Sequence, residues 1–111
     1  MRLSDVKGER TLDVIADLVE PIANIAQDED AALLFKPQKP AKGQTKEQEF
    51  GERARKAIPA LLKTHKSDVI LILATIAGVE PKEYADNMNL AGVVNDIYEL
   101  ITDEVFLTFL S

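Results

Sequence analysis

The sequence contains no cysteine, no tryptophan and only one histidine, His65. The missing cysteines exclude disulfides, thiol catalysis, iron–sulfur clusters and cysteine-ligated zinc, and a lone histidine excludes a histidine-rich metal site. No apolar run reaches the roughly 20 residues of a membrane span, because the longest one, 69–77, stops at Gly78. The first residues turn polar after one positive charge, so we expect no signal peptide and a protein that stays in the cytoplasm.

What is present is typical of a soluble globular protein. The 111 residues are 46% hydrophobic and 29% charged, which fits a single domain over 1–111. The net charge of −6 argues against general affinity for nucleic acid or anionic membranes. The charge is unevenly spread, because the segment 36–66 holds nine basic and three acidic residues whereas both flanking segments are acidic.

Apolar residues recur at steps of three and four, which predicts an all-α fold of five to seven helices around one core. The central helix is expected over about 67–77, apolar nearly all round, with Gly78 as a left-handed stop. Three amphipathic stripes are expected to face the core: Leu12, Ile15, Leu18, Val19, Ile22, Ile25 and Ala26; Phe50, Ala54, Ala57, Ile58, Leu61 and Leu62; and Leu90, Val93, Val94, Ile97, Leu100 and Ile101.

The boundaries of these helices follow from capping residues and breakers. Pro21 and Pro59 are expected to kink or restart their helices, and the segment 36–45, with two prolines and three lysines, is expected to be a flexible basic loop. Thr45 and Gln48 fit a capping box. Helix starts are further predicted at Ser4, Asp28, Ser67, Glu80, Asn89 and the run 102–104.

Catalytic and metal-binding chemistry find little support in the sequence. His65 and Asp68 form a candidate acid–base pair, but no nucleophile is nearby, so a surface or capping histidine is favoured. The acidic runs 28–30 and 103–104 lack the spacing of a calcium loop and are better explained as the starts of helices. We therefore predict a protein that is not an enzyme and has no catalytic residues, metal or cofactor.

Two surfaces are candidates for binding partners. The C-terminal apolar residues Phe106, Phe109 and Leu110 either close the core, which is favoured, or form a handle for a partner. The basic middle can contact phosphates, meet the acidic end of another copy, or simply be a solvated surface. Its residues are Lys36, Lys39, Lys42, Lys46, Arg53, Arg55 and Lys56.

Several stretches together resemble a family of small helical proteins from tailed phages and prophages of Gram-positive bacteria, the tail assembly chaperones. The resemblance covers nearly the whole chain outside the loop 36–45. The stretches that carry it are 3–9, 12–18, 58–63, 72–79 and the ending from Tyr84 through Asn95–Ile97 to Thr102–Glu104.

The resemblance implies a non-enzymatic function. Such chaperones coat the long, helical, aggregation-prone tape measure protein before the tail tube polymerises, and they are absent from the finished particle. It implies that this chain binds a tape measure protein in the bacterial cytoplasm. The uneven charge pattern adds the expectation that copies self-associate along it. The alternative is a small regulatory or nucleic-acid-binding phage protein that uses the basic segment 36–66.

Overall fold

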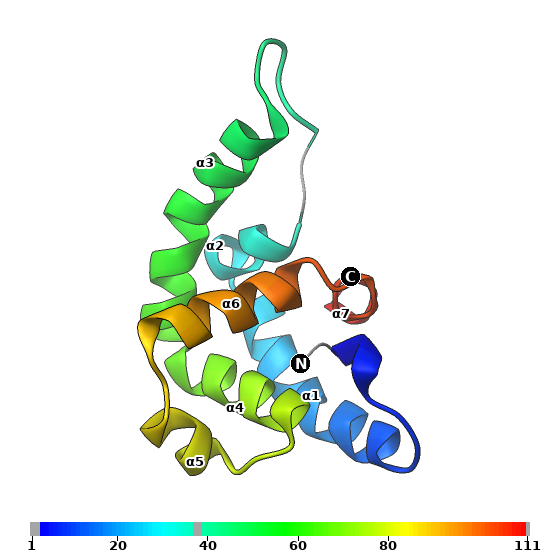
Figure 1. The fold of residues 1–111 in the computed structure, drawn as a ribbon. Helices are drawn as coiled ribbons and strands as arrows, with labels where there is room; N and C mark the ends of the chain where they lie inside the picture. The colour runs from blue at the N-terminus through cyan, green and yellow to red at the C-terminus, as the bar shows by residue number, and fades with distance from the viewer. Residues whose placement is uncertain (1–2, 37–38, 111) are drawn as a thin grey trace.

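The computed structural model describes residues 3–36 and 39–110, without the side chains of Phe109 and Leu110. Within this part of the chain there is no strand, and seven α-helices form one all-α domain, as the sequence predicts (Figure 1). The helices are α1 (Arg10–Ala26), α2 (Glu29–Ala32), α3 (Lys46–Pro59), α4 (Lys66–Ala77), α5 (Pro81–Asp86), α6 (Leu90–Ile101) and α7 (Glu104–Leu110). Short 3-10 helices lie at Leu3–Asp5 and Leu33–Phe35.

The core forms where α4 packs against α1. The predicted central helix is confirmed, and its buried side chains are Val69, Ile72, Leu73, Ala74 and Ile76. From α1, the buried side chains Val14, Leu18, Pro21, Ile22 and Ile25 face it. The expectation that Leu12, Ile15 and Val19 also face the core is wrong, because these residues lie on the outer side of α1 and are exposed. Burying large aliphatic side chains in this way is the main favourable contribution to folding.

Local capping signals place most helix boundaries as predicted. Thr45 and Gln48 form the capping box, with the Gln48 amide donating to Thr45 Oγ1 at 3.1 Å. Asn89 caps α6 through a 2.8 Å bond from the Gly92 amide. Gly78 ends α4 at φ +77, and the amide of Val79 then bonds back to the Ala74 carbonyl. These caps satisfy backbone groups that each helix end would otherwise leave unpaired.

Other boundaries differ from the predictions. Ser67 does not cap α4, which begins one residue earlier, with His65 at the cap position. Ser4 lies inside a 3-10 helix, where its amide donates to Asp103 at 3.0 Å instead of opening an α-helix. Glu80 occupies the predicted cap position of α5, but its side chain makes no cap bond.

The two prolines also behave differently from each other. Pro21 does not restart α1, which is continuous through it, because the proline ring is buried in the core and its packing offsets one lost hydrogen bond. Pro59 does end α3, and the chain continues directly as a π-helix, Ala60–Thr64, labelled η3.

The N-terminal half of α3 and residues 39–45 before it project from the body as an arm (Figure 1). The arm accounts for the elongated dimensions of 45 × 27 × 25 Å. The side chains of the arm are mostly polar and exposed. The apolar body lies at the other end of α3.

The C-terminal helix α7 also contributes to the core. Phe106 is fully buried and meets Phe35 edge-on, with 5.4 Å between ring centroids. Asp103 caps α7 through the Val105 amide and also accepts from Ser4, which ties the first described turn of the chain to the last helix. The favoured prediction that the C-terminal residues complete the core is confirmed for Phe106, whereas the side chains of Phe109 and Leu110 lie outside the described part.

We predict that Phe106→Ala lowers the free energy of unfolding by about 3–5 kcal/mol, because it leaves a cavity where an aromatic ring fills the core. Urea denaturation followed by circular dichroism measures this. The neighbouring variant Val105→Ala is the control, since Val105 is half exposed, and it should cost less than about 1 kcal/mol. Equal losses for the two variants would contradict the role of Phe106 as a core residue.

Candidate functional site

Helix α6 leaves most of its apolar face unburied. Leu100 is its only buried residue, whereas Leu90 is 84% exposed and Val94 and Tyr98 are each 59% exposed. These three residues follow one another at intervals of four, so they form one stripe along the helix. The prediction that Leu90 and Val94 face the core is therefore wrong, because the core is already filled by α1, α4 and Phe106.

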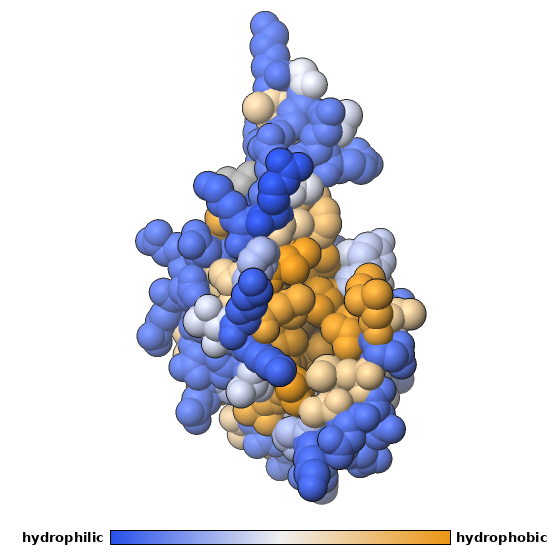
Figure 2. Space-filling view, turned by 90° about the vertical axis from the view of Figure 1, so that its left-hand side faces the viewer, coloured by the Kyte–Doolittle hydropathy of each residue, from blue (hydrophilic) through white to orange (hydrophobic). Residues whose placement is uncertain are grey.

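A second apolar wall faces this stripe from α3 and η3. Phe50, Ile58 and Leu62, all expected in the core, are each more than a third exposed. Together with α6 they line a groove of about 290 Å³ whose floor includes Leu61, Ile97 and Ile101. Among the described residues that line the groove, only Tyr98 carries a polar side-chain atom. Figure 2 shows this face as an apolar patch in the middle of the molecule, below the hydrophilic arm.

The groove continues into an adjoining hollow toward α4. This hollow, of about 410 Å³, shares Leu62, Leu90 and Val93 with the groove and extends to Met88. The two spaces therefore adjoin each other along α6, and together we call them the α3–α6 groove. Apolar grooves between helices are surfaces on which amphipathic helices dock in other proteins.

Polar contacts tie both walls of the groove to neighbouring elements. Tyr84 of α5 donates a short hydrogen bond to Asp96 of α6, and burial together with the Asp96 carboxylate raises the pKa of the Tyr84 hydroxyl. On the other wall, the Arg53 guanidinium donates to the carbonyls of Leu33 and Leu34 at 3.0 and 2.9 Å. These contacts tie α6 to α5 and α3 to the chain after α2.

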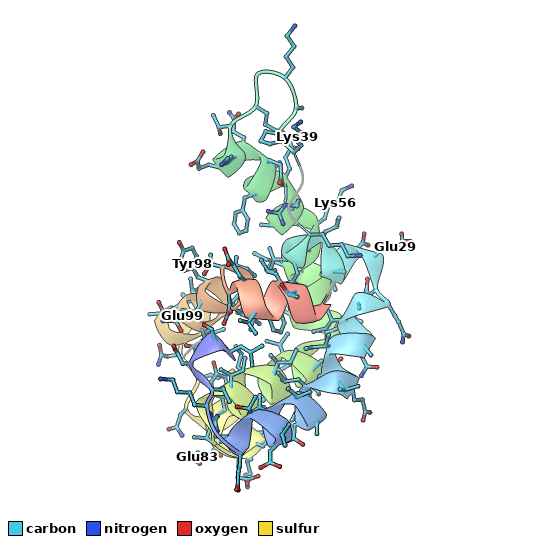
Figure 3. All side chains as sticks on the ribbon, turned by 90° about the vertical axis from the view of Figure 1, so that its right-hand side faces the viewer. Glu29, Lys39, Lys56, Glu83, Tyr98 and Glu99 are labelled. Atoms are coloured by element: carbon cyan, nitrogen blue, oxygen red, sulfur yellow. The ribbon has the colours of Figure 1, made fainter. Side chains whose placement is uncertain are left out.

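The predicted basic residues do not converge on one site. Lys39, Lys42, Lys46, Arg55 and Lys56 are exposed and spread along the arm and α3, and Lys36 is exposed where the arm leaves the body. Figure 3 shows Lys39 near the tip of the arm and Lys56 farther down α3. Arg53 differs from the others, because its guanidinium is engaged with Glu49 and lies 5.4 Å from the centre of the Phe50 ring.

His65 is buried, so the expectation of a surface residue is wrong; it does occupy the cap position of α4, although its side chain makes no cap hydrogen bond. Its Nδ1 lies 3.0 Å from Asp68, the partner expected from the sequence, and its Nε2 lies 2.9 Å from Asp28. Asp28 also caps α2. Because carboxylates occupy both ring nitrogens, the imidazole joins α2 to α4 and presents no nitrogen to a substrate.

The described residues were also searched for metal-binding groups and membrane-spanning helices. Among them, no group of three or more histidine, aspartate or glutamate side chains could hold a metal ion. No helix of this part is both long and apolar enough to cross a membrane. The feature that sequence reasoning missed is the α3–α6 groove.

We predict that protein stability decreases as the pH rises above neutrality, because His65 loses its proton. Hydrogen bonds from the imidazole to Asp68 and Asp28 raise the pKa of His65 above its ordinary 6.5. The stabilisation is therefore complete below 6.5 and is lost as pH passes through the raised value. The His65 hydrogen bond lowers the pKa of Asp28 below 3.8, so a second loss follows in acid.

The measurement is the urea midpoint at about pH 6 and about pH 9, with a lower midpoint expected at the higher pH. His65→Gln should flatten this difference, because glutamine does not titrate. Lys63→Gln, which removes an exposed cation two residues away, should retain it. A wild-type midpoint that rises from the lower to the higher pH would contradict the assignment.

Comparison with known proteins finds no matching family model, no matching curated protein and no matching solved structure.

Proposed function

We propose that this chain is a non-enzymatic assembly chaperone of a phage or prophage tail, which binds helical segments of a tape measure protein. The observation that carries the proposal is the α3–α6 groove, two adjoining apolar hollows that are open to solvent. Contiguous exposed apolar surfaces on soluble proteins mark sites of interaction with other proteins. The identity of the client comes from the family that the sequence resembles.

The shape and chemistry of the groove suit a helical client. Its walls offer aliphatic and aromatic side chains at intervals of one helical turn, such as Leu90, Val94 and Tyr98. An amphipathic helix presents matching anchors at positions i, i+3 or i+4 and i+7. A long helical protein supplies many such segments, so several copies of the chaperone can cover it before the tail assembles.

The proposal places the protein in the bacterial cytoplasm, where tails are built, and outside the finished particle. A chaperone of this kind must release its client when the tube subunits arrive. Release requires fast dissociation, and the dissociation rate is the quantity in which related complexes mostly differ.

We predict that purified full-length protein binds the product of a neighbouring long helical reading frame, and that Val94→Glu weakens binding at least about tenfold. The new carboxylate would be desolvated among apolar groups when a helix docks, which is unfavourable. Val94 is 59% exposed, so the fold should remain intact. Surface plasmon resonance or co-purification measures the effect.

The control variant is Ala41→Glu, which adds the same charge at an exposed position before the capping box of α3. It should bind the client as the wild type does. A wild-type protein that fails to bind any segment of the tape measure protein would overturn the proposed function. Equal binding by the Val94→Glu variant would show that the client uses another surface.

A second function, nucleic-acid binding, is favoured by one observation, the exposed cations of the arm. A gel shift at low salt tests it. We expect no saturable shift, because the net charge of −6 opposes binding and the side chain of Arg53 is engaged internally. A saturable shift lost on neutralising Lys39, Lys42 and Lys46 would establish this alternative instead.

A further inference from the structure

Charged side chains hold both ends of the segment 28–35, which contains α2. At its start, Asp28 Oδ2 lies 2.9 Å from Nε2 of His65, the residue that joins η3 to α4. At its end, the guanidinium of Arg53 donates to two backbone carbonyls. We call the first part of this segment, residues 28–32, the α2 turn.

The two ends of the segment differ in how much apolar packing supports them. Leu34 and Phe35 are large and buried, and the ring of Phe35 contacts that of Phe106. The α2 turn buries only the small side chains of Ala31 and Ala32. Stabilisation by burial follows the apolar area removed from water, and a helix of four residues is too short to be stable alone. The position of the α2 turn therefore depends strongly on its contact with His65.

The geometry at His65 requires a charged imidazole. Its Nδ1 lies 3.0 Å from Asp68 Oδ2 and its Nε2 lies 2.9 Å from Asp28 Oδ2, and an ionised carboxylate can only accept hydrogen bonds. The imidazolium carries a proton on each nitrogen and donates to both carboxylates, whereas the neutral ring carries one proton and donates to one of them. Loss of the second proton leaves a ring lone pair facing a carboxylate oxygen.

Of the two contacts, the one with Asp68 is better fixed. Asp68 lies three residues from His65, and the side-chain amide of Asn24 donates to its other oxygen at 3.2 Å. Asp28 is 37 residues away from His65 in the chain, and its side chain is 30% exposed compared with 21% for Asp68. The remaining proton therefore stays on Nδ1, and the contact that is lost is that between Nε2 and Asp28.

The charged groups that face the imidazole are the two carboxylates. Among the described residues, the ion pairs of Asp28 and Asp68 are both with His65. The hydrogen bond to Asp68 and then that to Asp28 raise the pKa of His65 above 6.5, although burial opposes them. The charged side chains next to these residues in the chain are exposed, namely Lys63, Lys66 and Glu29.

We infer that His65 is a pH-dependent latch, whose imidazolium holds the α2 turn against η3 and whose neutral form releases it. The release is local, because Phe35 and the bonds from Arg53 keep the end of the segment in place while α1 and α4 stay packed. Since η3 also carries Leu61 and Leu62 into the α3–α6 groove, release loosens one wall of the groove, and the importance of that effect for a client rests on the proposed function.

The test is methyl NMR of the full-length protein, labelled at alanine, with a neutral soluble paramagnetic agent at about pH 6 and about pH 9. The methyl groups of Ala31, Ala32 and Ala74 are all fully buried, so the agent should reach none of them at the lower pH. At the higher pH, the ratio of open to closed α2 turn should rise at least about tenfold, as expected for the loss of one charge-assisted hydrogen bond. Relaxation should then increase at Ala31 and Ala32 and stay unchanged at Ala74 of α4.

Asp28→Asn gives the sharpest result. Asparagine caps helices as well as aspartate does, and its amide can donate to Nε2 of the neutral ring while Nδ1 still donates to Asp68. In this variant Ala31 and Ala32 should therefore stay shielded at the higher pH. Asp30→Asn is the control, because it removes the same charge from an exposed position of α2, and it should behave as the wild type does.

Three results would overturn the latch. They are shielding of Ala31 and Ala32 in the wild type at the higher pH, an increase in relaxation that Ala74 shares, and release of the α2 turn in Asp28→Asn as in the wild type. The measurement contains no client, so a protein that binds no tape measure segment can still show the latch. Client binding by a wild type whose α2 turn stays shielded at both pH values would contradict only the latch.

Discussion

The packing of α4 against α1 is the constraint on which the remaining structure depends. Charged groups fix both ends of α4. At its N-terminal end, the imidazole of His65 joins Asp68 of the first turn to Asp28, and Asn24 of α1 also donates to Asp68. At its C-terminal end, Arg10 of α1 donates to two final carbonyls. An anion at the start and a cation at the end both complement the helix dipole, so the electrostatics and the apolar contacts favour the same alignment.

Once this pair is formed, the chain has more apolar helix than the core can cover. A domain of 111 residues has a high ratio of surface to volume, and α1, α4, Phe35 and Phe106 already fill the interior. Helix α6 then closes the fold through Leu100, while its remaining apolar residues stay half-buried or exposed. The exposed apolar side chains are not scattered, because those of α3 and α6 face one another across a single groove.

Signals that depend on near neighbours in the chain were predictable. The capping box at Thr45, the cap at Asn89 and the left-handed Gly78 each depend on residues within a few positions. Contacts that join distant segments were not, such as that between His65 and Asp28, 37 residues apart. Likewise the length of the apolar run predicted α4, but nothing local revealed which helices would enclose it.

The groove was missed for a related reason. Helical periodicity shows that a face is apolar but not whether that face meets the core or another molecule. Helix α1 did carry a usable signal, because apolar residues at 12, 14, 15, 18, 19 and 22 span too wide an arc for one core-facing stripe. An excess of this kind indicates a helix that is buried on one side and available on the other.

The composition of the groove also determines how selective it can be. Its lining offers almost no hydrogen-bonding group besides the Tyr98 hydroxyl, so it cannot reject a helix by leaving buried polar atoms unpaired. Apolar walls accept many helices of similar shape, and discrimination falls to the charges at the edge, of which Lys66 lines the adjoining hollow. Low selectivity of this kind is compatible with the proposed function, in which one groove holds many different segments of one long client.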